Sequence, residues 1–173
     1  MSRSVYITRL AKFLPNEPIA NEEIEDILGK INGKASRAKS IILRSNQIKT
    51  RYYAIDRQGN STHTNAQLAK EAILNLTDER FKAEDIQLLA CGTSSPDQIL
   101  PSHTSMVQGE LKAAPTEIVA TSGACCNIIQ SLKYSFMSIQ GGFTDNAVCV
   151  GSERMSHWMV SKYFQEEAEK IDR

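Results

Sequence analysis

Short apolar runs alternate along this sequence with segments in which apolar residues recur every three or four positions. The runs predict β-strands over residues 5–10, 86–93, 117–120 and 146–151. The periodic segments predict helices over residues 21–32, 64–76, 102–111 and 126–140. Asn21, Ser102 and either Thr64 or Asn65 begin or precede three of these segments, and their side chains are typical helix caps. The polar tail, residues 161–173, is also helix-prone.

Strands and helices therefore alternate, and the connections are long enough to hold helices. Such connections join parallel strands, and strands with continuous apolar centres are covered on both faces. We expect an α/β protein with a mostly parallel sheet flanked by helices. A chain of 173 residues is long enough to bury a sizeable core in one domain.

Charge is balanced, with 20 basic and 20 acidic residues, which argues against a dedicated nucleic-acid binder. No apolar run approaches the roughly 18 residues of a membrane span. The N-terminus lacks the apolar core of a signal peptide. We therefore expect a cytoplasmic protein without a membrane span.

The charge is nevertheless uneven locally. Between Asp26 and Asp56 there is no acidic residue but there are seven cations, namely Lys30, Lys34, Arg37, Lys39, Arg44, Lys49 and Arg51. This segment is either a solvated face or a docking surface for phosphates or for an acidic carrier protein.

The four cysteines form neither a CxxC pair nor a zinc framework, so we expect no metal site. Cys91 and Cys149 lie in strand-like runs and should pack as reduced core residues. Neighbouring Cys125 and Cys126 could form a vicinal disulfide, which a reducing compartment disfavours.

Cys125 is the candidate nucleophile. It lies in the small-residue stretch 121–127, between the strand at 117–120 and the helix that follows. Small residues permit a sharp turn, and the positive end of a helix dipole favours a thiolate over a thiol. The alternative is a small buried residue in a tight turn.

Three segments carry a resemblance to a known family: GTSSPDQILPS at 92–102, IVATSGACC at 118–126 and AVCVGSE at 147–153. Their order and spacing resemble the first half of the β-ketoacyl-ACP synthase III family, which are condensing enzymes with a thiolase fold. Within that family, residues 48–60 and 94–103 are most similar to condensing enzymes that form dialkylresorcinols.

The resemblance implies that Cys125 takes an acyl group from a thioester. A carbanion derived from malonyl-ACP, or from another ACP-bound β-ketoacyl unit, would then attack the acyl group. No cofactor is implied, because acyl-CoA or acyl-ACP is the substrate. The oxyanion would be held by backbone N–H groups, including that of Cys125, and Cys126 would serve as packing.

Further site residues are also implied by the resemblance. Leu100 matches a position that reaches across a homodimer into the partner's acyl pocket, and the dimer is expected through residues 117–121. Arg44, Lys49 and Arg51 lie near the segment that binds the nucleotide of coenzyme A. His157 lies where many members have an arginine, a difference that favours an ACP-bound donor.

The resemblance makes residues 1–173 an N-terminal thiolase-like half, without the catalytic histidine and asparagine of the second half. Such a chain should lack turnover by itself and should expose an apolar surface. His63 and His103 match no catalytic position, and we expect both to be capping or surface residues. The alternative function is a non-catalytic thiolase-like subunit or remnant that binds acyl chains or a partner. A redox or metal protein using Cys125 and Cys126 is a third, less favoured alternative.

Overall fold

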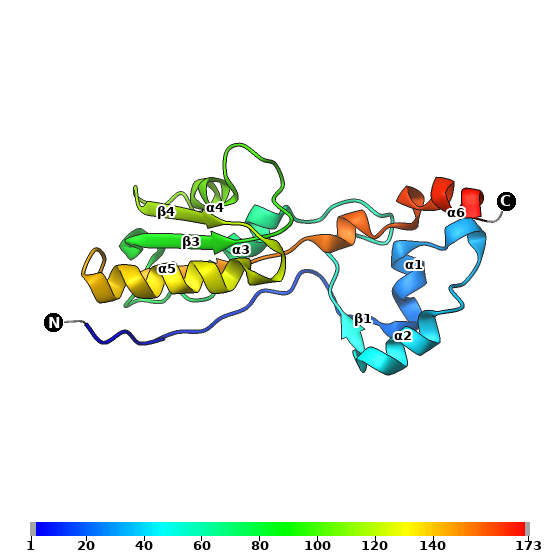
Figure 1. The fold of residues 1–173 in the computed structure, drawn as a ribbon, viewed down its shortest axis with the longest axis horizontal. Helices are drawn as coiled ribbons and strands as arrows, with labels where there is room; N and C mark the ends of the chain where they lie inside the picture. The colour runs from blue at the N-terminus through cyan, green and yellow to red at the C-terminus, as the bar shows by residue number, and fades with distance from the viewer. Residues whose placement is uncertain (1–2, 172–173) are drawn as a thin grey trace. The chain divides into compact units, whose positions relative to one another are not determined.

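The computed structural model describes residues 3–171 (Figure 1). The chain divides into two compact units. Unit 1 comprises Met1–Phe13 and Thr64–Glu153, and unit 2 comprises Leu14–His63 and Arg154–Arg173. Each unit has its own packed residues and is described separately.

Unit 1 is built on a three-stranded parallel sheet in the order β4-β3-β5. The strands are β3 (Leu88–Gly92), β4 (Glu117–Thr121) and β5 (Ala147–Gly151). In register, Gly92 at the end of β3 lies beside Thr121 and Gly151. All five residues of β3 are buried, as expected for a strand covered on both faces. These strands and their parallel pairing confirm the α/β prediction.

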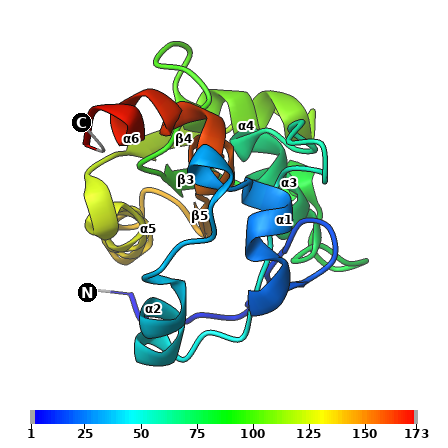
Figure 2. The same cartoon turned by 90° about the vertical axis from the view of Figure 1, so that its right-hand side faces the viewer.

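Helices cover both faces of this sheet (Figures 1 and 2). One face packs against α3 (Asn65–Leu74) and α4 (His103–Leu111), whose starts are capped by Thr64 and Ser102. The core of this layer comprises Ala66, Ala69, Ile73, Val107, Leu89, Cys91, Val148 and Val150, with Ile86 beside them. Alternate strand residues, including Gly92, face the other layer, which is α5 (Asn127–Gly141).

Helix α5 turns polar side chains toward the sheet and exposes large apolar ones, which is the opposite of an ordinary surface helix. Its buried residues are Asn127, Ser131, Ser135 and Ser138. The Ser131 and Thr121 hydroxyls lie 2.7 Å apart, and the Ser135 hydroxyl donates to the Ser131 carbonyl at 3.0 Å. Its large apolar side chains are exposed instead, namely Ile129, Leu132, Tyr134, Phe136 and Met137. The small hydroxyl residues bring the helix close to the sheet, and the outer face agrees with the expected uncovered apolar surface.

The predicted strand at residues 5–10 is wrong. This segment is extended but pairs with no strand of the described chain, and its side chains Tyr6, Ile7 and Leu10 are exposed. It is fixed instead by side chains, because Arg9 forms an ion pair with Asp78 at 2.6 Å. A β-strand needs a neighbour for its N–H and C=O groups, and an apolar run does not provide one.

Unit 2 contains a short antiparallel pair, β1 (Ile19–Ala20) and β2 (Thr50–Arg51). Its helices are α1 (Ile24–Leu28), α2 (Lys39–Asn46) and α6 (Gln165–Ile171). Ile27, Tyr53 and Ile55 form the core of this unit. Residues 172–173 of the predicted helical tail lie outside the described residues.

The predicted helix over residues 21–32 is shorter and interrupted. A 3-10 turn at Asn21–Glu23 precedes α1, and Gly29 ends the helix with a φ of +82°. That left-handed conformation is easily adopted by glycine but stops the helical hydrogen bonding. The sequence did not predict α2, whose apolar residues are consecutive rather than periodic.

Candidate active site

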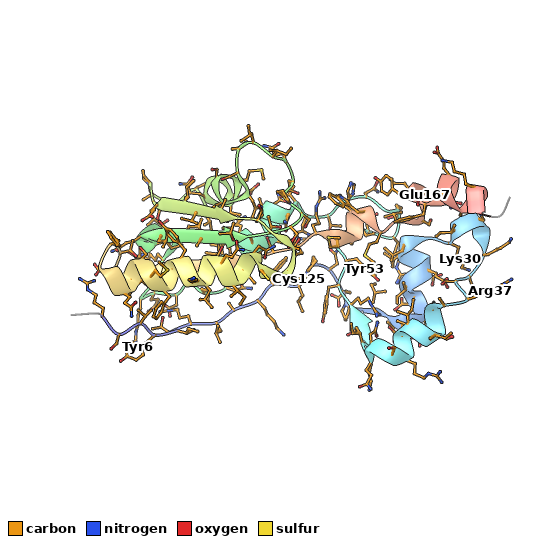
Figure 3. All side chains as sticks on the ribbon, in the orientation of Figure 1. Tyr6, Lys30, Arg37, Tyr53, Cys125 and Glu167 are labelled. Carbon is orange, nitrogen blue, oxygen red and sulfur yellow. The ribbon has the colours of Figure 1, made fainter. Side chains whose placement is uncertain are left out.

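Cys125 lies at the carboxyl end of the sheet, in a 3-10 turn at Ala124–Cys126 between β4 and α5. Its side chain is exposed, and Figure 3 labels it at the N-terminal end of α5. The turn is sharp, because Gly123 has a φ of +136° and Ala124 a φ of +34°. A positive φ is unusual for alanine and marks local strain, which is often found at functional sites.

Two glycines allow α5 to begin directly on the strand ends. A Cβ at Gly92 would lie 2.6 Å from the Asn127 carbonyl carbon, closer than side chains approach backbone. A Cβ at Gly151 would lie 3.1 Å from the Ile128 side chain. The absence of both side chains therefore fixes how near the first turn of α5, and with it Cys125, comes to the sheet.

Hydrogen bonds from neighbouring loops hold the turn. The Ser94 hydroxyl donates to the Ala124 carbonyl at 2.9 Å, and the Asn127 amide donates to the Ser94 hydroxyl at 2.8 Å. The Cys126 N–H donates to the Gly123 carbonyl at 3.2 Å. The residue that precedes the candidate nucleophile is thus fixed through a side chain from the loop after β3.

A carboxylate lies behind this arrangement. Glu153 accepts hydrogen bonds from the Ser94 N–H and the Ser95 hydroxyl, each at 2.6 Å, and from the Asn127 amide at 3.2 Å. Burial would raise the pKa of Glu153, but the hydrogen bonds from Ser95, Ser94 and Asn127 outweigh it and lower the pKa. Glu153 therefore stays ionised beside the turn.

The four cysteines fall into two classes. Burial raises the pKa of Cys91 to about 12 and that of Cys149 to about 11, so both are inert thiols near neutral pH. Cys91 is buried in β3, as predicted, whereas Cys149 in β5 is only half-buried. Cys126 was expected to pack as well, but it is exposed, as is Cys125.

The other predicted site residues are divided between the units. Leu100 lies in unit 1, in the loop before α4, and is 82% exposed. Arg44, Lys49, Arg51 and His157 all lie in unit 2.

Two of these unit 2 residues have partners within their own unit. The Arg51 guanidinium donates to the Asn21 side-chain oxygen, and the His157 ring lies 3.4 Å from the Ser61 hydroxyl. His157 also meets the Tyr163 ring edge-on. Arg44 and Lys49 are exposed, as expected for either a solvated or a docking face.

His103 is not a surface residue, contrary to the sequence-based expectation. It is the first residue of α4 and is 4% exposed. Its Nε2 lies 3.0 Å from the Ser152 hydroxyl, and Asn65 donates to the Ser152 carbonyl at 3.3 Å. Desolvation lowers the pKa of His103, although the charges of Asp97 and Glu153 oppose the shift. A position next to a helix cap gave no sign of this burial, which depends on the packing of α4 over the strand ends.

Glu153 is the functional candidate that sequence reasoning missed. A signal existed, because it follows a predicted strand and because the carboxyl ends of parallel strands meet at one edge. Within residues 3–171, no group of three or more His, Cys, Asp or Glu side chains could hold a metal ion. No helix in the same range has the length and apolar character needed to cross a membrane.

Comparison with known proteins gives a consistent relationship, although no protein-family model matches the chain. Over 155 residues it is 27% identical to β-ketoacyl-[acyl-carrier-protein] synthase III of Chlorobaculum tepidum, covering 87% of this chain and 43% of that protein. The protein of the same name from Porphyra purpurea is 28% identical over 155 residues, covering 90% and 44%. The crystal structure of 3-oxoacyl-[acyl-carrier-protein] synthase III from Aquifex aeolicus aligns with a TM-score of 0.68 at 23% identity.

That structural match covers 84% of this chain and 44% of the Aquifex aeolicus chain. The chain thus spans less than half the length of the relatives that it matches. The aligned structure has the thiolase-like fold, and the layers of unit 1 agree with it. Over most of its length the chain is therefore similar to proteins named β-ketoacyl-[acyl-carrier-protein] synthase III, and it has a thiolase-like α/β fold.

Proposed function

We propose that this chain carries the acyl-accepting cysteine of a condensing enzyme of the β-ketoacyl-ACP synthase III type. The observation that carries the proposal is the exposed Cys125 on a strained turn at the carboxyl edge of the parallel sheet. The relatives named above are β-ketoacyl-[acyl-carrier-protein] synthases, which supports a thioester as the substrate class.

In the first step the Cys125 thiolate attacks the carbonyl carbon of an acyl thioester. A new carbon–sulfur bond to Cys125 forms, the bond to the donor's sulfur breaks, and the donor leaves as a thiolate that takes up a proton. The oxyanion that forms in between is stabilised by backbone N–H donors, of which that of Cys125 is one. This exchange needs no metal or redox cofactor.

In the second step an ACP-bound carbanion attacks the acyl group and forms a carbon–carbon bond. It arises from a malonyl unit by loss of carbon dioxide or from another β-ketoacyl unit. The family uses a histidine and an asparagine here, and we assign that role to no residue of this chain. Dialkylresorcinol formation, in which two long acyl units are joined, is the specific pathway that residues 48–60 and 94–103 favour.

Acyl-ACP is the donor that we favour, with acyl-CoA as the second possibility. Arg44 and Lys49 would meet the donor's phosphates or the acidic surface of the carrier protein, together with Arg51. His157 lies where many family members have an arginine that binds the nucleotide of coenzyme A. Its contacts with Ser61 and Tyr163 support a packing role for this histidine, which favours acyl-ACP over acyl-CoA as the donor. We place the reaction in the cytoplasm.

Leu100 would set acyl length across a homodimer formed near residues 117–121. Its 82% exposure supports a role toward a neighbouring molecule. In Leu100→Phe the larger side chain should shift the preference toward shorter acyl groups. Profiling the acyl products of wild type and variant measures this, and an unchanged length preference would exclude Leu100 from the pocket.

Intact-mass analysis after incubation with octanoyl-CoA or octanoyl-ACP tests the function. An added octanoyl mass that is absent in Cys125→Ala but present in Cys126→Ala establishes the nucleophile and identifies the donor. Labelling that persists in Cys125→Ala would refute the assignment. Absence of labelling in wild type, with either donor, would leave two explanations: the site forms only together with a second half, or the chain is the non-catalytic thiolase-like subunit. Repeating the measurement with a longer form that contains the second half separates them.

A further inference from the structure

Near the candidate nucleophile, the Glu153 carboxylate accepts four hydrogen bonds. Its Oε1 accepts from the Ser94 N–H at 2.6 Å and from the Asn127 amide at 3.2 Å. Its Oε2 accepts from the Ser95 hydroxyl at 2.6 Å and from the Thr93 hydroxyl at 3.4 Å. These four donors are neutral, and all belong to the loop after β3 or to the start of α5. The carboxylate therefore joins two segments that are far apart in sequence.

The contact with Asn127 fixes the orientation of a buried amide. Asn127 is 5% exposed, and its NH2 group donates to Glu153 and to the Ser94 hydroxyl. Its carbonyl oxygen is consequently turned toward the start of α5, where it accepts the Ile128 N–H at 2.6 Å. Without an acceptor at Glu153 the amide loses one of its two NH2 hydrogen bonds and is oriented by the Ser94 hydroxyl alone, which loosens the oxygen that accepts the Ile128 N–H.

The contact with Ser94 also connects Glu153 to Ala124, the residue before Cys125. Glu153 holds the Ser94 backbone, and the Ser94 hydroxyl donates to the carbonyl of Ala124 at 2.9 Å. Ala124 has a φ of +34° and immediately precedes Cys125. A strained residue keeps its conformation only while its surroundings hold it there.

We propose that Glu153 is a positioning residue for Cys125, which acts by accepting hydrogen bonds from Ser94 and Asn127 and not by carrying charge or transferring a proton. The consequence for acyl transfer rests on the proposed function. The consequence for the order of residues 121–128 does not, so the two can be tested separately.

Two substitutions distinguish hydrogen bonding from charge. Glu153→Ala removes every acceptor. In Glu153→Gln the side-chain oxygen can still accept from the Ser94 N–H and from Asn127, while its NH2 group can donate to the Ser95 hydroxyl, which rotates to accept. The Thr93 hydroxyl already accepts from Asn65 and from the Ser95 N–H, so its long contact of 3.4 Å is lost. The glutamine variant therefore keeps the connections to Ser94 and Asn127 but loses the charge. Glu110→Ala, on α4 of the same unit, is a matched control for loss of a carboxylate.

Hydrogen exchange of the native chain, followed by mass spectrometry, tests the positioning itself. In Glu153→Ala, peptides covering residues 121–128 should exchange at least about tenfold faster, while α3 keeps its wild-type rate. Glu153→Gln should remain within about threefold of wild type, and Glu110→Ala should be unchanged. Unaltered exchange at 121–128 in Glu153→Ala would overturn the proposal, as would equal loosening in the glutamine variant.

The single-turnover rate of Cys125 acylation by octanoyl-ACP and by octanoyl-CoA then tests whether the position of Cys125 limits its reaction. The saturating rate constant should fall at least about tenfold in Glu153→Ala and recover in Glu153→Gln, with the half-saturating donor concentration unchanged. A merely structural role would lower the fraction of acylated protein and leave the rate constant as it is. Lack of acylation in wild type would count against the proposed function but would leave the exchange result as the decisive test of Glu153.

Discussion

Gly92 is the position where one methyl group should disturb the active-site turn most. A Cβ there would lie 2.6 Å from the Asn127 carbonyl carbon and 2.7 Å from the Ile128 nitrogen. Ordinary contact begins at 3.4 Å, so Gly92→Ala is short of space by about 0.8 Å. Both colliding atoms are backbone, which cannot move aside by a change of rotamer, so the start of α5 must move away from β3.

This displacement should lower both the free energy of unfolding and the rate of acylation. Overpacking of a filled site destabilises by roughly 1–3 kcal/mol, and we expect the upper end because the neighbours are main chain. A shift of the turn by nearly 1 Å would also misplace Cys125, and misplacement of that size can slow a positioned reaction by about 100-fold. The variant should therefore lose both stability and acylation rate.

Gly109→Ala provides the matched control. Gly109 lies within α4, and a Cβ there would have nothing within 4 Å. Alanine is favoured over glycine in a helix interior, so this variant should gain about 0.5–1 kcal/mol. Urea unfolding and single-turnover acylation of both variants measure the contrast. If Gly92→Ala is as stable and as reactive as Gly109→Ala, the close packing of α5 on β3 is refuted.

Three further predictions concern unit 1. Between pH 9 and 11 the free energy of unfolding should fall by up to about 1.4 kcal/mol per pH unit on account of Cys91, because this thiol, whose raised pKa is about 12, then ionises only in the unfolded chain. Cys149, whose pKa is raised to about 11, adds a smaller fall. Urea titrations should show a slope in wild type that becomes shallower, but does not vanish, in Cys91→Ala. Desolvation lowers the pKa of His103 below 6.5, so its contribution is present at higher pH and is lost as the pH falls below 6.5. His103→Gln should thus reduce the dependence of stability on pH between 5 and 6.5, and an unchanged dependence would contradict this. On α5, Ser135→Leu should cost roughly 1–3 kcal/mol because it overfills the sheet side, while Met137→Gln should stay within about 0.5 kcal/mol and reduce self-association in light scattering.

The sequence correctly predicted those strands in which an apolar run also has a neighbouring strand to pair with. The strands β3, β4 and β5 have apolar centres and find one another in a parallel sheet. Residues 5–10 have the same pattern but no paired neighbour among the described residues, so the pattern alone could not predict a strand. In unit 2 the helical periodicity continues through Gly29, but the left-handed conformation there ends α1.

The candidate site was predictable only in its first residue. Cys125 could be found because small residues before a helix start are a local signal. The place of Glu153 after a predicted strand put it at the correct edge of the sheet, but its partners, like those of His103, belong to loops that approach one another only after the sheet has formed. Glu153 meets Ser94 and Asn127, which are 59 and 26 positions away in sequence. The apolar period of the chain carries no information on such polar contacts.

The two faces of α5 explain why the turn can be well defined while the outer surface is apolar. The contacts described for the Cys125 turn all come from the sheet side, where Gly92 permits the approach and Ser94 and Glu153 supply hydrogen bonds. Phe136 and Met137 take part in none of these contacts and are 43% and 54% exposed. Exposed apolar side chains favour association, yet their removal breaks none of the hydrogen bonds described for Ala124. Substitutions on the outer face should consequently change what the chain associates with, whereas those on the inner face should change the geometry of the turn that carries Cys125.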